Sequence, residues 1–323
     1  MKIFRSLSVL LLCVGLFSCD APRLNPLDPQ NPDYQFAALD GFVKTVTGPP
    51  QPIAGVSVFW KSQNILLTTD ANGYFKLDNL PKQDGWLYFQ KDGFSSDSTL
   101  VQWNNQKTFH VDMFLHSIPR LDSLAIYTSV ENRYPDVQKY KLTIQAGITD
   151  TEGNVDSVFV VANQLHFNKQ LNYNPSSRSY QNDFSQTDLG LQSMDEGIGK
   201  IFNIIVKDKQ KRISNINIGS STIKRIIKQE VLPETPSNKQ TVGSTPTLRW
   251  TRFLPGFNFR YMVQIYTDEV SPVLVWQKDN ISKDDIQVIS GATLPAGDYF
   301  WVIWSIDDFQ DRCRSKPASF VVQ

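Results

Sequence analysis

The stretch TTDANGYFKL, at residues 68–77, decides the fold of the first domain. Asp70 to Gly73 forms a polar turn, and its Asn-Gly pair suits backbone positions that require a positive φ. The flanking residues, 66–69 and 74–77, have the composition of β-strands. We therefore expect them to be the two arms of a hairpin.

Alternation on either side of this turn extends the prediction to a whole domain. In residues 56–61, VSVFWK, the side chains of Val56, Val58 and Trp60 would face one way and the others the opposite way. This is the two-residue period of a strand. Further strands are expected at 86–91 and 108–115, so residues 36–117 are predicted to form a β-sandwich.

Several short motifs in this domain resemble those of the carboxypeptidase regulatory-like domain. They are LDGFV at 39–43, PIAGVSV at 52–58, the stretch at 68–77, Leu80-Pro81 and KDGF at 91–94. The resemblance implies a transthyretin-like β-sandwich, an accessory domain of metallocarboxypeptidases that carries no catalytic site. The zinc ligands of those peptidases begin with His-x-x-Glu. None of the three histidines here, His110, His116 and His166, has a glutamate three residues later.

A second set of strand patterns occupies residues 118–229. Apolar and polar residues alternate across 140–148, a polar turn follows at 150–154, and residues 155–162 are expected to return as a strand. Two more strands are expected between residues 200 and 218. Short strands separated by polar turns resemble a bacterial Ig-like domain, which implies a second β-sandwich.

Residues 230–323 are predicted to form a third domain, a β-sandwich that begins with a proline-containing linker at 229–239. This region resembles a fibronectin type III domain. Trp250 lies where that family places a core tryptophan, and residues 259–265 alternate as a strand. The segment LPAGDY, which ends at Tyr299, resembles the tyrosine corner, in which the tyrosine hydroxyl bonds to nearby backbone.

The first residues have the pattern of a bacterial lipoprotein leader. Residues 1–18 combine a positive start, Lys2 and Arg5, with an apolar core too short to span a bilayer. The following motif, LFSC, resembles a lipobox and implies cleavage before Cys19 and lipid attachment to its sulfur. Phe17 departs from the small residue that is usual at its position.

The expected location is the cell envelope. Lipid on Cys19 would hold the chain on a membrane, which we predict to be the outer rather than the inner membrane. The proline-rich residues 19–35 would form a semi-rigid tether. Asp20 stands where an aspartate retains lipoproteins in the inner membrane of some enteric bacteria. The choice between the inner and the outer membrane therefore stays open. An ordinary secretory signal, cleaved near Ala21, is the alternative.

Charge and motifs argue against several functional classes. Lysine plus arginine and aspartate plus glutamate balance at 32 each, and no basic stripe occurs, so we expect no nucleic-acid partner. No metalloprotease, serine hydrolase or P-loop motif is present. We therefore expect no catalytic residue, no cofactor and no metal. Cys313 is expected to be a buried, unreactive side chain.

Two acidic turns leave a calcium alternative open. One cluster is Asp150, Glu152 and Asp156, and the other is Asp307, Asp308 and Asp311. Neither matches an EF-hand loop. Aspartate is also an ordinary turn residue, so turn formation is the preferred interpretation.

One strand of the third domain is apolar on both faces. If Tyr299, Trp301 and Ile303 face the core, the residues between them face outward, where a solvated sheet normally carries polar side chains. Together with outward residues of the neighbouring strand they form what we call the Trp304 patch: Met262, Tyr266, Phe300, Val302, Trp304 and Ile306. An exposed apolar patch marks an interaction surface. The alternative is that the second domain or a loop covers it.

The sequence therefore predicts an all-β chain of three tandem β-sandwich domains after a leader and a tether. The predicted function is that of a non-enzymatic, lipid-anchored cell-envelope protein that binds or presents a protein or glycan partner. Two alternatives stand beside it. One is an accessory subunit of an outer-membrane export or uptake machine, and the other is a hydrolase with a site between domains.

Overall fold

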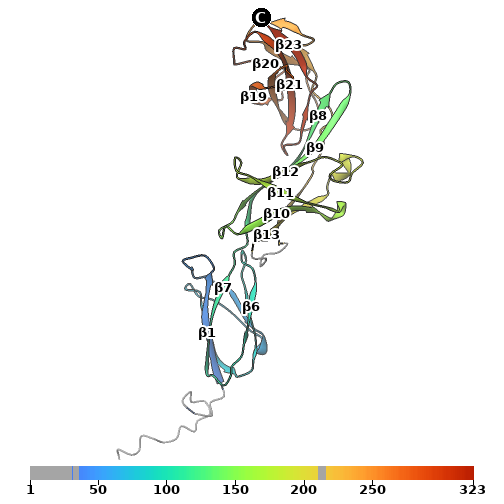
Figure 1. Cartoon of the computed structure of the whole chain (residues 1–323). Coiled ribbons are helices and arrows are strands. Elements are labelled where there is room, and N and C mark those ends of the chain that lie inside the picture. The colour runs from blue at the N-terminus through green and yellow to red at the C-terminus, as the bar shows by residue number, and fades with distance from the viewer. Residues whose placement is uncertain (1–30, 32–35, 210–215) are drawn as a thin grey trace, which may run out of the picture. The chain divides into compact units, whose positions relative to one another are not determined.

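The computed structural model describes residue 31, residues 36–209 and residues 216–323 (Figure 1). The predicted leader at 1–18, the lipidation site Cys19 and most of the tether lie outside the described residues. Strands dominate the described chain, whose only helical segments are short 3-10 turns, so the all-β fold class is confirmed. Within that part of the chain, no helix is long and apolar enough to cross a membrane.

Two compact units make up the described chain, the first ending at Ile118 and the second running from Pro119 to Gln323. The first unit is a sandwich of two sheets, with strand orders β4-β1-β7 and β3-β2-β5-β6. Its elements are β1 (Phe36–Thr45), β2 (Ser57–Trp60), η1 (Lys61–Gln63), β3 (Ile65–Thr68), β4 (Tyr74–Pro81), β5 (Gly85–Gln90), β6 (Asp97–Val101) and β7 (Thr108–Leu115).

Alternation along each strand builds the core of this unit. Trp60 of β2 and Leu87 and Phe89 of β5 point between the sheets and are buried. Phe75 of β4 approaches from the other sheet, and its ring meets that of Phe89 edge-on at 5.7 Å. Because side chains alternate, the residues between these positions must lie on the outer side of their sheet.

The turn at 70–73 forms as predicted, but its two arms do not pair. The Asp70 carboxylate accepts the backbone N–H groups of Asn72 and Tyr74, both at 2.8 Å, and Gly73 has a φ of 72°. However, β3 pairs with β2 and β4 pairs with β1. The hairpin prediction is therefore wrong, because the chain crosses from one sheet to the other at this turn.

Thr69 provides a physical reason for the crossover. Its buried hydroxyl donates to the Ile53 carbonyl at 2.7 Å and accepts the Val56 N–H at 2.9 Å. These two bonds tie the end of β3 to the segment before β2. The chain is thereby kept in the β2 sheet until the turn carries it to the other one.

The second unit is built on one sheet of 13 strands, which follows the order β14-β13-β10-β11-β12-β9-β8-β22-β21-β18-β19. Off this path, β23 pairs with β21, and β16 pairs with β23. The first module in it contains β8 (Arg120–Arg133), β9 (Val137–Thr149), β10 (Val155–Ala162), η2 (Asn163–Leu165), β11 (Phe167–Asn174), β12 (Ser179–Phe184), η3 (Met194–Gly197), β13 (Ile201–Asp208) and β14 (Ile216–Thr222). We call it the β8–β14 module.

The remaining strands form the β15–β23 module. They are β15 (Pro233–Thr235), β16 (Gln240–Val242), β17 (Thr247–Trp250), β18 (Phe259–Thr267), β19 (Leu274–Ser282), β20 (Gln287–Ile289), β21 (Gly297–Asp307), β22 (Arg312–Arg314) and β23 (Ala318–Val322). Strands β15, β17 and β20 make a separate small sheet.

The β8–β14 module curls so strongly that its last strand returns to its first. A Cβ added to Gly219 of β14 would lie 2.3 Å from the Leu121 side chain of β8. Inside, Phe167 meets Phe184 and Phe202 edge-on at 5.0 and 6.2 Å. Strand β10 forms at the predicted residues after the turn at 150–154, but it pairs with β11 and β13 and not with β9.

Two expectations for the β15–β23 module are confirmed. Trp250 and Trp301 are buried in its core together with Tyr261. The Tyr299 hydroxyl donates to the Pro295 carbonyl at 3.1 Å, which is the hydrogen bond expected of a tyrosine corner.

The expected linker at 229–239 is instead part of this module. Val231 is buried in its core, and residues 233–235 form β15. The Glu230 carboxylate accepts the Lys316 backbone N–H at 2.7 Å. Apolar burial and strand pairing thus order a segment whose prolines had indicated a spacer.

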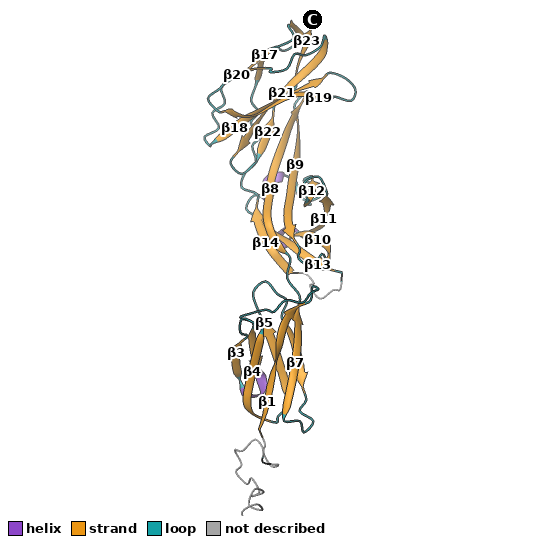
Figure 2. Ribbon diagram, turned by 90° about the vertical axis from the view of Figure 1, so that its left-hand side faces the viewer, coloured by secondary structure: helices purple, strands orange, loops and turns teal. Residues whose placement is uncertain are grey.

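A parallel strand pair joins the two modules of the second unit. Residues 312–314 of β22 pair with residues 129–131 of β8 (Figure 2). Val130 of β8 also belongs to the core cluster of the β15–β23 module. The two modules therefore share a sheet and part of a core.

The first unit depends on a close approach at Gly41. A Cβ at this position would lie 1.9 Å from the Val111 carbonyl oxygen of β7, which pairs with β1. We expect Gly41→Ala to lower the free energy of unfolding by about 1–3 kcal/mol or more, because backbone cannot move aside as a side chain can. Chemical denaturation of the full chain would measure it. Gly243→Ala, where nothing lies within 4 Å, is the control; equal effects from both would contradict the prediction.

Candidate binding surface

The outer side of the β3-β2-β5-β6 sheet carries apolar side chains where a solvent-facing sheet normally carries polar ones. Five of them form what we call the aromatic face: Phe59, Leu66, Trp86, Tyr88 and Leu100. Leu66 is 65% exposed, Trp86 44%, Leu100 43% and Tyr88 37%. Their buried neighbours on the same strands, such as Trp60 and Leu87, fix them in this outward position.

Strand register arranges the surface in rows that run across the sheet. Leu66, Phe59 and Tyr88 occupy directly paired positions on β3, β2 and β5. One step away along the strands, Trp86 is paired with Leu100 of β6. Since successive same-side residues on a strand are about 6.6 Å apart, the two rows make one continuous apolar surface.

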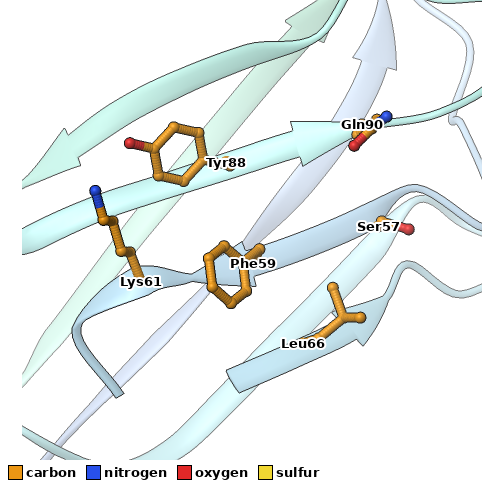
Figure 3. Close-up of a pocket in the computed structure, with 6 residues that line it drawn as sticks. All are labelled: Ser57, Phe59, Lys61, Leu66, Tyr88 and Gln90. Carbon is orange, nitrogen blue, oxygen red and sulfur yellow. The ribbon is translucent and has the colours of Figure 1, made fainter. Parts of the chain in front are cut away.

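The rings of this surface present their faces outward. Figure 3 shows the rings of Phe59 and Tyr88 lying broad side to the viewer above β2 and β5. Their centroids are 6.3 Å apart, and the ring planes differ by 35°. Trp86 follows Tyr88 at 6.5 Å and 38°. A shallow depression of about 540 Å³ lies over Phe59, Leu66 and Tyr88.

Polar side chains border the aromatic face. Ser57 and Gln90 are paired across β2 and β5 on one side, and Lys61 follows β2 on the other. The side chains of these three residues and the Tyr88 hydroxyl form no hydrogen bond or ion pair with any other described residue. They are therefore available to a ligand, while the rings supply apolar contact area. Lys61 is the one ionisable side chain among those that border the depression, apart from Tyr88.

The residues of the Trp304 patch share one face, but little of that face is exposed. Val302, Ile306 and Met262 are buried, with exposures of 0%, 7% and 9%. Tyr266 and Phe300 are half-buried and stack on each other at 5.3 Å. The expectation that these side chains form an exposed patch is therefore corrected.

Arginines of β22 provide the physical reason. Strand β22 pairs with β21, and the guanidinium groups of Arg312 and Arg314 lie 6.0 and 5.9 Å from the Trp304 ring. The Trp304 indole N–H also donates to Gln264 at 2.8 Å. The same chain thus covers Trp304, which is the alternative that the sequence had left open.

The two acidic clusters form hydrogen-bonded turns. Asp150 accepts the backbone N–H groups of Glu152, Asn154 and Val155. Asp307 likewise accepts those of Phe309 and Asp311 at 2.9 Å. Among the described residues, no three histidine, cysteine, aspartate or glutamate side chains are placed to hold a metal ion.

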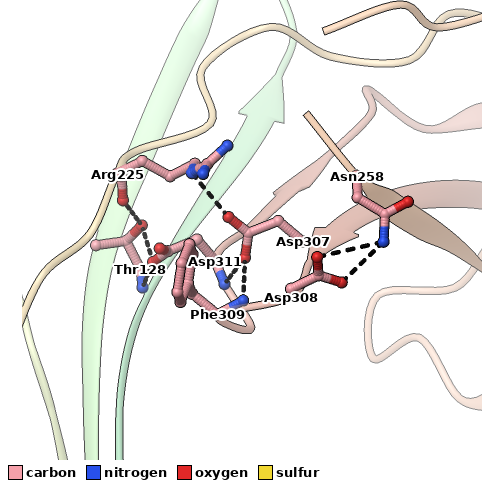
Figure 4. Close-up of polar contacts among 7 residues, drawn as sticks. All are labelled: Thr128, Arg225, Asn258, Asp307, Asp308, Phe309 and Asp311. Atoms are coloured by element: carbon pink, nitrogen blue, oxygen red, sulfur yellow. Dashed lines mark hydrogen bonds and ion pairs between the residues drawn. The ribbon is translucent and has the colours of Figure 1, made fainter. Parts of the chain in front are cut away.

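Asp307 and Asp311 also connect the two modules of the second unit (Figure 4). Asp311 accepts the Thr128 backbone N–H at 2.6 Å and lies 2.9 Å from the Thr128 hydroxyl. Asp307 forms an ion pair of 3.0 Å with Arg225. Both carboxylates are almost fully buried.

Burial perturbs the ionisation of the groups at this junction. It raises the pKa of Asp311 to about 6, against the opposing effect of the Thr128 hydrogen bonds, and the nearby Asp307 charge adds to the rise. Burial likewise raises the pKa of Asp307. Cys313 is buried as expected, and its burial raises the pKa of the thiol to about 12, so it is not a nucleophile at neutral pH.

The histidines do not form a catalytic group with a nucleophile. His110 Nδ1 lies 2.8 Å from Asp40 on the outer side of the β4-β1-β7 sheet, and the Tyr74 hydroxyl donates to the same carboxylate at 3.3 Å. In the described chain no serine, threonine or cysteine is bonded to His110. His116 is buried, and His166 ends the turn η2.

The aromatic face was not predicted from the sequence. The signal was present, because residues 86–90 read WLYFQ and are apolar at both even and odd positions. The same two-sided pattern had selected the strand at 299–306. A pattern of this kind shows that both faces carry apolar side chains, but it does not say which face another part of the chain covers.

Comparison with known families supports the assignment of the first domain. Residues 40–122 match the family model of the CarboxypepD_reg-like domain. This confirms the resemblance that was expected from the motifs at 39–43, 52–58 and 68–77. No curated protein matches the chain significantly.

Solved structures similar to this chain contain fibronectin-like and pilin modules. The FN1–FN3 domains of chicken CNTN1 share 9% identity, with coverage of 84% of this chain and 92% of theirs, at a TM-score of 0.31. The fibronectin(III)-like modules of Clostridium thermocellum CbhA share 13%, with 64% and 93% covered, at 0.30. The major pilin subunit of Bacillus cereus shares 12%, with 89% and 95% covered, at 0.27. These values are too low to assign a function to this chain.

The raised pKa of Asp311 predicts a pH-dependent stability. The folded chain binds this proton more tightly than the unfolded chain, whose carboxyl has the ordinary value of 3.8. The stabilising contribution is therefore fully present below the unfolded value of 3.8, and it is lost as pH rises from there through about 6. Between about pH 5 and pH 7.5, deprotonation of Asp311 should cost the wild type about 1 kcal/mol of unfolding free energy. We expect the Asp311→Asn variant to lack this part of the loss.

Calorimetry of the full chain at both pH values would measure this difference. Asp308→Asn is the matched control, because Asp308 is exposed and its carboxylate contacts Asn258 at the surface. Identical pH dependence in the wild type and the Asp311 variant would contradict the prediction.

Proposed function

We propose that this chain is a non-enzymatic binding protein, held at the cell envelope by lipid on Cys19, with the aromatic face as its binding surface. The observation that carries the proposal is the exposure of Leu66, Trp86, Tyr88 and Leu100 on one sheet face. Exposed apolar patches of this kind mark interaction sites on soluble domains. The family matched by residues 40–122 is also a non-catalytic domain.

The positions of the titratable groups favour binding over catalysis. Asp307 and Asp311, the buried carboxylates between the two modules of the second unit, are 1% and 0% exposed, so substrate cannot reach them. The exposed pair of His110 and Asp40 lacks a bonded nucleophile in the described chain. Neither arrangement presents a side-chain nucleophile at an accessible site of the described chain, which covalent hydrolysis needs.

Photo-cross-linking in intact cells tests the binding surface. A photoreactive phenylalanine analogue in place of Tyr88 is expected to form adducts with a cell-envelope component. The same analogue in place of Tyr134, which is 68% exposed in the second unit, is the control and should form different adducts or none. An adduct with an outer-membrane transport protein would favour the accessory-subunit alternative. Absence of adducts at position 88 would contradict the proposed surface.

Lipid attachment has its own test. Cys19→Ala removes the sulfur that would carry the acyl chains, so the protein is expected to move from the membrane fraction to the soluble fraction. Fractionation and labelling with a fatty-acid analogue would measure both effects. Cys13→Ala, a change in the predicted leader, should leave anchoring intact. Continued membrane association of the Cys19 variant, with labelling retained, would rule out this anchor.

A further inference from the structure

We infer that the aromatic face binds an uncharged polysaccharide built of pyranose rings. This inference rests on the proposed function and names the partner class of the same surface. It depends on three properties of the face: the orientation of the rings, the charge around them and the distribution of polar groups.

Ring orientation suits flat, stacked sugars. Phe59 and Tyr88 lie with their faces outward above the strands (Figure 3), with centroids 6.3 Å apart across β2 and β5, and Trp86 lies 6.5 Å from Tyr88 along β5. A pyranose ring exposes axial C–H groups on one face, and such groups pack against the electron-rich face of an aromatic ring. Neighbouring ring planes differ by 35° and 38°, so each ring can offer its face to a different sugar of one chain.

The charge around the surface argues for a neutral ligand. Lys61 is the one permanently charged side chain that borders the depression. A nucleic acid or a polyanionic glycan would place a negative charge at each repeat and would need several cations along its path. A neutral polysaccharide has no such requirement.

Polar groups lie where sugar hydroxyls would be. The hydroxyl of Ser57 and the amide of Gln90 lie on one side of the Phe59-Tyr88 pair, and the Tyr88 hydroxyl belongs to the pair itself. Lys61 lies on the other side, the side toward Trp86. None of these groups is used by another described residue. Stacking on the rings would leave the equatorial hydroxyls of a sugar at its edge, within reach of these donors and acceptors.

The openness of the surface favours the middle of a polymer over a chain end. The aromatic face extends over four strands, from Leu66 on β3 to Leu100 on β6. The depression on it is shallow and is not an enclosed pocket. A mono- or disaccharide would bury little area on such a surface. A longer chain can contact Phe59, Tyr88 and Trp86 at once, and the affinity then comes from several modest contacts.

Native affinity electrophoresis of the full-length protein tests this inference. The gels would contain soluble neutral polysaccharides, namely xyloglucan, mannan, mixed-linkage β-glucan, hydroxyethylcellulose and pullulan, with polygalacturonate and heparin as charged comparators. We expect retardation by at least one neutral polysaccharide and by neither charged one. Trp86→Ala and Tyr88→Ala should each weaken binding about tenfold, as expected for the loss of one aromatic contact.

Controls separate the loss of binding from the loss of folding. Tyr134→Ala removes a ring of the second unit that is more exposed, at 68%, and should leave retardation unchanged. Circular dichroism of each variant would verify the fold. No retardation by any neutral polysaccharide, or full retardation of both ring variants, would overturn the inference.

The same experiments distinguish this inference from the function on which it rests. If position 88 cross-links to a protein while no polysaccharide retards the chain, the binding function stands and the glycan assignment falls. If position 88 forms no adduct and no polysaccharide binds, both fail.

Discussion

The two-sidedness of a β-strand is the constraint on which the first unit depends. Placing Trp60, Leu87 and Phe89 in the core forces Phe59, Trp86 and Tyr88 onto the outer side of the same sheet. Alternate residues of the same few strands therefore form the core and the candidate binding surface. Moving the outer residues to the inner side would require a one-residue change of strand register, which would expose the core.

In the second unit, the same two-sidedness has a different outcome. The outer side of β21 is also apolar, but Arg312 and Arg314 lie over Trp304, and β22 links β21 to β8. The buried Asp311 adds hydrogen bonds from the β15–β23 module to Thr128 of the β8–β14 module. An apolar outer face thus serves internal packing in one unit and remains exposed in the other.

Sequence alone predicted local features well and strand partners poorly. The turn at 70–73 and the Tyr299 hydrogen bond depend on residues close in the chain, and both were predicted. The burial of Trp250 was expected from the resemblance to a fibronectin type III domain. The partners of β4 and β10 were not, because pairing depends on contacts between distant segments, such as the Thr69 bonds that precede the crossover. The segment around Val231 looked like a spacer for the same reason, since its burial depends on strands far ahead in the sequence.

The exposure of a face is likewise a property of the whole fold. The stretches at 86–90 and 299–306 have the same two-sided apolar pattern, yet only the first keeps large rings in solvent. The difference arises from Arg312 and Arg314, which reach Trp304 only because β22 turns back beside β21. No local pattern in residues 299–306 contains that information.

The pairing of β1 with β7 has a mechanical consequence. These are the first and last strands of the first unit, and they run parallel in continuous register from Ala38↔Thr108 to Thr45↔Leu115. A pull applied at Phe36 and Leu115 therefore loads the ladder along its length, in shear, and its hydrogen bonds must fail together rather than one at a time. Resistance to such a force is set by the rate of unfolding and not by the equilibrium stability. A domain of this topology can bear tension between its two ends without opening.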